Sequence, residues 1–210
     1  MASIVKSKGE SNFEPVPMGT HVARCITVVN LGLQESKWGP KAKHYIGFEV
    51  PSVRVEWEKD KQKHEGPAII GSTYTSSLSP KAILRQHLES WRGKAFTEAE
   101  LEAFDLMNLL GVPCMLSVTH TVNGSNVYAN IASIMGLPKG MECPQQEGEI
   151  LRFDPTEPTA TTDLAKLPNW MREKIEKGAA LAQHQTESPA PQGIGHADYS
   201  KDEFDDDIPF

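Results

Sequence analysis

Basic and aromatic residues recur through residues 37–74 in a pattern that suits contacts to a nucleic-acid strand. Binding a single strand without regard to its sequence requires aromatic rings on which bases stack and cations that pair with phosphates. The residues that supply these two kinds of group are Lys37, Trp38, Lys41, Lys43, Tyr45, Arg54, Trp57, Lys59 and Tyr74. Trp38 is the strongest candidate, because it lies in a Gly-Pro loop among lysines, where no strand or helix pattern would bury it.

The last residues of the sequence combine acidic and apolar groups as a docking peptide does. This tip consists of Asp205, Asp206, Asp207, Ile208, Pro209 and Phe210. Phe210 offers an apolar anchor beside a carboxylate, so a partner needs only an apolar pocket rimmed by Arg or Lys. Pro209 biases Ile208 toward extended conformations, which lowers the entropy cost of binding. We expect the tip to bind partner proteins, with the aspartates raising the association rate.

No set of residues completes a catalytic or metal-binding motif. His87 and Glu89 match the His-x-Glu half of a nucleobase deaminase signature, but Ser117 stands where the second cysteine after Cys114 is needed. Three cysteines are too few for a four-thiolate zinc site and form no disulfide framework. Adjacent aspartates in the tail lack the fixed geometry of a metal site. We expect no enzymatic activity, no cofactor and no metal.

Charge divides the chain into two parts. The formal net charge is −7, yet residues 1–140 carry 15 basic and 13 acidic residues, a net of +2, and residues 141–210 carry 6 and 15, a net of −9. Such asymmetry predicts a body with one role and an acidic tail with another. No apolar run approaches the ~20 residues of a membrane helix, and no signal-peptide core is present, so we expect a cytoplasmic protein with no membrane partner.

Hydrophobic patterning predicts a mainly β body. Alternating apolar residues predict five strands, over 20–33, 45–57 with an interruption at Pro51, 68–78, 113–122 and 126–135. A loop is predicted over 34–43 and a charged turn over 59–66. Asn123-Gly124-Ser125 between two such runs is typical of a hairpin.

A helical segment separates the third strand from the fourth. Ser79 followed by Pro80 predicts a helix start, and Gly93 predicts its end. Thr97 and Glu100 predict a capping box on a second, short helix. Five strands with this helical insertion predict an oligonucleotide-binding (OB) type of barrel over residues 1–140.

The C-terminal third has a different composition. Residues 141–182 are predicted to be a linker with one short amphipathic helix near 168–177. Residues 183–210 are rich in Gln, Ser, Pro, Gly and Asp, which bury too little apolar area to offset chain entropy, so we predict a disordered acidic tail.

Two resemblances bear on the function. The tip Asp-Asp-Asp-Ile-Pro-Phe resembles the C-terminal tip of bacterial single-stranded DNA-binding proteins, which implies docking onto replication, recombination and repair enzymes. The body resembles a family of tailed-phage proteins found among replication genes, on the residues Lys8-Gly9-Glu10-Ser11-Asn12-Phe13, Pro17-Met18-Gly19-Thr20-His21-Val22-Ala23-Arg24, Glu89-Ser90-Trp91-Arg92-Gly93, Asn130-Ile131-Ala132-Ser133 and Leu167-Pro168-Asn169-Trp170.

The phage resemblance implies an OB-fold protein that coats single-stranded DNA in the cytoplasm of the infected bacterium. Its tip would recruit host replication, recombination and repair proteins. Two alternatives stay open: an interaction protein that binds no DNA and imitates the host tip, and a recombination protein that anneals complementary strands. The body differs from the bacterial proteins at most positions, so their tetrameric state is not carried over and the oligomeric state stays undetermined.

Overall fold

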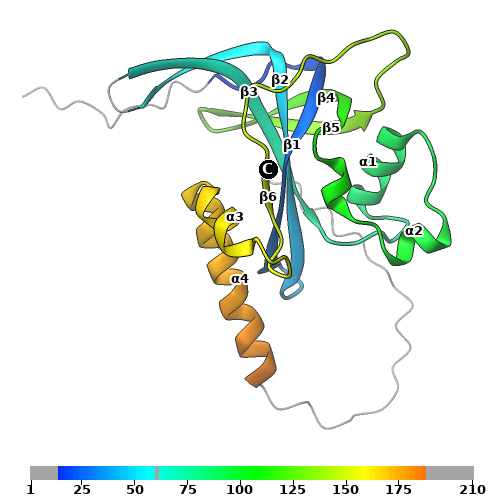
Figure 1. Ribbon diagram of the computed structural model, residues 1–210, viewed down its shortest axis with the longest axis vertical. Coiled ribbons are helices and arrows are strands. Elements are labelled where there is room, and N and C mark those ends of the chain that lie inside the picture. Colours follow the sequence, from blue (N-terminus) through cyan, green and yellow to red (C-terminus); the bar gives the residue numbers. More distant parts are fainter. Residues whose placement is uncertain (1–13, 60–61, 188–210) are drawn as a thin grey trace, which may run out of the picture.

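A curled, antiparallel half-barrel of five strands forms the body of the computed structural model, which describes residues 14–59 and 62–187 (Figure 1). The strands lie in the order β3-β2-β1-β4-β5, and a short sixth strand, β6, pairs in parallel with β1. Their bounds are β1 Gly19–Gln34, β2 Lys41–Lys59, β3 Gln62–Thr75, β4 Pro113–Asn123, β5 Asn126–Met135 and β6 Leu151–Phe153. The mainly β fold with an OB-type strand order, predicted from the sequence, is confirmed.

The curl arises in β1, which belongs to both halves of the sheet. Residues 19–24 of β1 pair with β4, and residues 24–34 pair with β2. The β1–β2 register shifts between Cys25 and Thr27 and again between Asn30 and Gly32, where Gly32 has a φ of 69°. Bulges of this kind bend a strand and increase its twist. Cα atoms of β3 and β5 consequently come within 8 Å of each other, although no hydrogen-bonded ladder joins these two strands.

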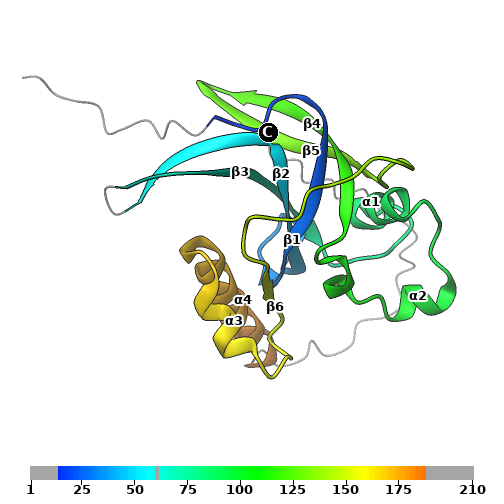
Figure 2. The same ribbon diagram turned by 45° about the horizontal axis from the view of Figure 1, so that its top comes forward.

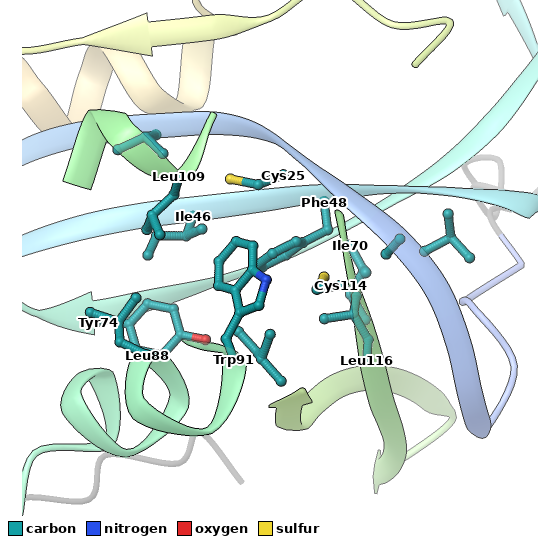
Figure 3. Packing of buried hydrophobic residues seen from close by; sticks show 14 of the residues in the cluster. Cys25, Ile46, Phe48, Ile70, Tyr74, Leu88, Trp91, Leu109, Cys114 and Leu116 are labelled. Atoms are coloured by element: carbon teal, nitrogen blue, oxygen red, sulfur yellow. The ribbon is translucent and has the colours of Figure 1, made fainter. Parts of the chain in front are cut away.

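The main hydrophobic core fills the inner face of the half-barrel beneath helix α1 (Ile83–Arg92) (Figure 3). Leu84, Leu88 and Trp91 are the buried residues of α1. The Trp91 ring lies 5.5 Å from the ring of Phe48, and its Nε1 donates a hydrogen bond to the Pro113 carbonyl at 3.0 Å. One side chain therefore ties α1 to both β2 and β4.

The helical insertion between β3 and β4 begins later than the sequence predicts. Ser79 does not cap α1, because the Ser79 carbonyl accepts a hydrogen bond from the Ala82 N–H at 3.0 Å and Pro80 lies in the resulting turn. The φ that proline fixes suits the second residue of a turn as well as the first residue of a helix. The capping box between Thr97 and Glu100 is present on α2 (Glu98–Glu102), as predicted. A 3-10 helix, η1 (Leu106–Leu109), follows it.

Strand β2 is longer than predicted at both ends. The predicted loop over 34–43 is confined to residues 35–40, and Pro51 does not end the strand, although the β2–β3 register shifts between Val50 and Arg54. The predicted charged turn over 59–66 is mostly strand, since Gln62 pairs with Lys59. The paired residues 54–59 and 62–67 extend beyond the rest of the sheet and are called the arm below (Figures 1 and 2).

The prediction of a linker over 141–182 is corrected, because much of this segment packs on the outer face of the half-barrel. Helices α3 (Ala160–Lys166) and α4 (Asn169–Glu187) lie on the side of the sheet opposite α1 and α2 (Figures 1 and 2). With β6 they enclose a second hydrophobic core, whose buried members are Val29, Leu31, Phe153, Leu167 and Met171. The predicted helix near 168–177 exists and continues through residues predicted to be disordered. The rest of the predicted tail, 188–210, lies outside the described residues.

Residues 143–148, called the strap below, are held across the sheet by buried and half-buried polar groups. The Arg24 guanidinium donates hydrogen bonds to the carbonyls of Cys143 and Pro144 at 3.0–3.1 Å. The carboxylate of the fully buried Glu49 accepts hydrogen bonds from the N–H groups of Glu147 at 2.9 Å and Gly148 at 2.7 Å. These contacts satisfy a buried charge that would otherwise be costly.

Candidate nucleic-acid interface

The nine residues predicted to contact nucleic acid fall into three separate places. Five lie in or beside the β1–β2 loop: Lys37, Trp38, Lys41, Lys43 and Tyr45. Arg54, Trp57 and Lys59 lie on the arm at the other end of β2, and Tyr74 lies near the end of β3. Tyr45 and Trp57 are separated by twelve residues of strand, about 40 Å along an extended chain. The structure thus does not form one continuous site from all nine.

The β1–β2 loop holds Trp38 out in solvent. The Gly39 N–H donates to the Ser36 carbonyl at 3.1 Å, and the Ser36 hydroxyl donates to the Gly39 carbonyl at 2.6 Å. Gly39 has a φ of 97°, a conformation that residues with a Cβ rarely adopt. The Trp38 side chain is 64% exposed at the head of this turn. An indole held in this way is available to stack on a base without first leaving the core.

Cations and one aromatic ring continue from the loop along one face of β2. Lys41, Lys43 and Tyr45 are alternate residues of a regular stretch of strand, so their side chains point to the same, outer face of the sheet. We call Trp38, Lys41, Lys43 and Tyr45 together the β2 strip. It places two ammonium groups between two aromatic residues, which is the composition of a binding path for a single strand.

Tyr45 has a supporting position within the β2 strip. Its ring lies over Gly47 and Gly71, where an added Cβ at Gly47 would come within 3.0 Å of the ring and one at Gly71 would overlap it. The ring of Trp170 on α4 meets it edge to face, with centroids 5.2 Å apart at 78°. Burial raises the pKa of Tyr45 to about 12. Since Tyr45 is covered by backbone and by Trp170, it presents little free ring surface.

The arm carries one exposed aromatic ring and a compensated cation. Trp57 is 46% exposed and stacks on His64 with centroids 5.8 Å apart. Arg54 forms ion pairs with Glu65 at 3.1 Å and with Glu147 of the strap at 2.6 Å, and hydrogen bonds to these carboxylates raise the pKa of Arg54. Arg54 thus joins the arm to the strap, and its predicted phosphate contact would compete with these two carboxylates. The Lys59 side chain is not among the described groups.

Tyr74 was wrongly predicted to contact nucleic acid. Its side chain is 4% exposed and lies in the main core, with its hydroxyl 3.0 Å from Nδ1 of His87 (Figure 3). Tyr74 shares the inner face of β3 with Ala68 and Ile70, which lie six and four residues before it along the strand. That alternation was visible in the sequence and indicates burial.

Acidification below about pH 6.5 is expected to lower the free energy of unfolding through His87. Burial lowers the pKa of His87 from its ordinary value of 6.5, because the core solvates imidazolium poorly. The unfolded chain therefore binds a proton that the folded chain excludes, and stability falls as the pH drops from 6.5 toward the folded-state pKa. Urea unfolding at about pH 7.5 and about pH 5.5 measures the loss.

His87→Gln is the matched variant for this measurement. It is expected to lose less stability than the unsubstituted protein over the same pH interval. A residual loss is expected from His44, whose pKa burial also lowers. Equal losses in the two proteins would show that His87 does not titrate in this way.

The sequence did not reveal the C-terminal residues that border the β2 strip. The sequence predicts a short amphipathic helix around Trp170 but gives neither Trp170 nor Lys174 a role in binding. The structure places the Lys174 ammonium 5.6 Å from the centroid of the Trp170 ring. Their spacing of four residues was a local signal for a shared helix face, but only the fold shows that Trp170 meets Tyr45. The tip, residues 205–210, lies outside the described residues.

The described residues were also compared with the requirements of a metal site and of a membrane-spanning helix. Within residues 14–59 and 62–187, no three or more His, Cys, Asp and Glu side chains gather as metal ligands. None of the helices in these ranges has the length and apolar character needed to cross a membrane. Neither a family model nor a curated protein matches the chain. The features that bear on function are therefore the half-barrel, the β2 strip and the sequence of the tip.

Proposed function

We propose that this protein binds single-stranded DNA without sequence preference and, through its C-terminal tip, docks onto partner proteins. The observation that carries the DNA-binding half is the β2 strip, where the exposed indole of Trp38 in the β1–β2 loop precedes two lysines on the outer face of β2. Stacking on an aromatic ring tolerates every base, and lysines that pair with phosphates add affinity that does not depend on sequence.

A single strand suits this surface better than a duplex. Trp38 can stack only on a base whose face is accessible, and the bases of a duplex are already stacked on each other. The net charge of +2 over residues 1–140 leaves the body able to attract phosphates although the whole chain is acidic. The phage resemblance supports action on strands exposed during phage replication and recombination in the bacterial cytoplasm.

Replacing Trp38 by alanine is expected to weaken binding of an oligo-dT strand about tenfold, within the range for loss of a base-stacking ring. Fluorescence anisotropy of a labelled oligonucleotide measures the affinity, with a duplex of equal length as the control. Because Trp38 is exposed, its removal should leave the unfolding midpoint unchanged. If the unsubstituted protein binds neither DNA, the DNA-binding half of the proposal is wrong and the tip becomes the functional part.

The tip is proposed to supply the second activity, docking onto host replication, recombination and repair proteins. Phe210→Ala is expected to weaken competition for a host enzyme that binds the bacterial tip by at least about tenfold, because a buried aromatic anchor commonly dominates a small interface. The measurement is displacement of a labelled peptide of residues 202–210 from that enzyme. Phe204→Ala, which removes the other aromatic ring of residues 202–210, is the control and should compete normally. Equal competition by both variants would contradict the role given to Phe210.

A further inference from the structure

Helix α4 is fixed against the sheet beside the β2 strip. Gly178 of α4 approaches β1 so closely that an added Cβ would lie 2.7 Å from the Leu33 carbonyl oxygen. The Gln34 side-chain amide donates to the Lys174 carbonyl at 2.9 Å and to the Leu31 carbonyl at 2.7 Å. These contacts to the backbone at Gly178 and at Lys174 fix both the rotation of α4 about its axis and its distance from the sheet. Side chains at positions four and eight residues before Gly178, on the same row of α4, are therefore held in place.

Trp170 and Lys174 occupy that row and adjoin the β2 strip. The Trp170 ring packs at 78° against the ring of Tyr45 and is still 42% exposed. The Lys174 ammonium lies 5.6 Å from the Trp170 centroid, within the range of a cation–π contact. Buried Met171, next in the sequence, anchors the start of the helix in the second core. The exposed part of the indole is thus backed by a packed aromatic ring and flanked by a cation.

We infer that α4 is part of the DNA-binding surface, with Trp170 as a base-stacking ring and Lys174 as a phosphate contact. This inference rests on the proposed function and changes which residues perform it. Tyr45 acts as a positioning residue, because its ring supports Trp170 while its own surface is covered. The path then runs from Trp38 past Lys41 and Lys43 to Trp170. A segment outside the predicted OB domain becomes necessary for binding.

Charge and exposure favour a nucleic-acid strand over an apolar peptide as the occupant of this path. Lys41, Lys43 and Lys174 border it, and all three carry the charge that phosphates require. A helix that packed only for stability would gain by burying Trp170, the largest apolar side chain of α4. In this fold the smaller Met171 is buried, and nearly half of the indole surface remains in solvent.

The test compares Trp170→Leu with the unsubstituted full-length protein in binding to labelled oligo-dT. Leucine keeps an apolar contact for Tyr45 but removes the flat ring, so we expect affinity to fall by about 5- to 150-fold. The unfolding midpoint and the helical circular dichroism signal should not change. Lys174→Gln should weaken binding and reduce its salt dependence, whereas Lys166→Gln, which removes an exposed lysine from α3, should do neither.

Trp170→Phe covers the case in which leucine loosens α4. Phenylalanine retains a ring, so binding should stay within a few-fold of the unsubstituted protein, while quenching of tryptophan fluorescence by oligo-dT should decrease. Undiminished quenching, or unchanged affinity of Trp170→Leu in a protein that otherwise binds oligo-dT, would overturn the role of Trp170 and leave the proposed function intact. Absence of oligo-dT binding by the unsubstituted protein would overturn both.

Discussion

Replacing Lys41 and Lys43 together by glutamine is expected to weaken oligo-dT binding about 70-fold at about 50 mM monovalent salt. On a single strand, each phosphate contact contributes about 0.7 to the slope of log affinity against log salt, because binding releases condensed counterions. Two lost contacts should lower that slope by about 1.4. Anisotropy titrations at several salt concentrations measure both quantities. The affinities of the double variant and of the unsubstituted protein should converge as the salt concentration rises.

The control for this prediction removes the same charge elsewhere. Lys94 follows the end of α1, and Lys139 follows Gly136, which lies close to the Trp91 carbonyl at the same end of α1. Lys94→Gln combined with Lys139→Gln lowers the net charge equally at a site away from the β2 strip. If this variant loses as much affinity and salt dependence, general attraction by the body governs binding, and the β2 strip is not a defined path.

The parts of the fold that the sequence predicts well are those governed by local patterns. The hairpin at Gly124 needs a residue with positive φ, and the capping box between Thr97 and Glu100 needs residue types three positions apart. Both ends of strand β5 were predicted correctly, because apolar residues alternate along it and turn residues border it. Pro80 misled because one fixed φ serves two local structures. A local pattern therefore predicts an element correctly when it fits one local structure, and it misleads when it fits two.

Apart from the helix near 168–177, the C-terminal third could not be predicted in this way, because contacts distant in sequence stabilise it. Glu49 lies 98 residues from Glu147, whose N–H it binds. β6 has three residues and too short a pattern to predict a strand. Glycine inside a helix normally lowers helix propensity, yet Gly178 is what allows α4 to touch β1. The chemistry of each of these residues becomes clear only beside its partner.

In the candidate site too, local pattern predicts some features, and others depend on contacts distant in sequence. Trp38 was found because the residues around it form a polar loop, and an exposed position follows from that alone. Tyr45 had the right residue type and the right face of β2, but its cover comes from α4. Arg54 has the right charge, and only the fold shows that it pairs with Glu65 and Glu147. Sequence patterns thus identify the face of a strand and the type of group on it, while its availability depends on what packs there.

Trp91→Ala is expected to lower the free energy of unfolding by about 3–5 kcal/mol, the range for truncating a large buried aromatic side chain. Trp91 is 6% exposed, and its removal deletes the contact with Phe48 and leaves the Pro113 carbonyl without its indole donor. A loss of this size is a large fraction of the 5–15 kcal/mol that typical domains possess. Urea unfolding followed by circular dichroism measures it.

Trp38→Ala is the matched comparison for Trp91→Ala, because the same substitution is made at an exposed tryptophan instead of a buried one. Trp91 holds α1 on the inner face of the sheet, away from the β2 strip, so the folded fraction of Trp91→Ala should bind oligo-dT with unchanged affinity. Trp38→Ala should be as stable as the unsubstituted protein and bind weakly. If Trp91→Ala instead lost affinity while still folded, the DNA path would have to include the α1 side of the half-barrel. The separation of a stabilising inner face from a binding outer face would then be wrong.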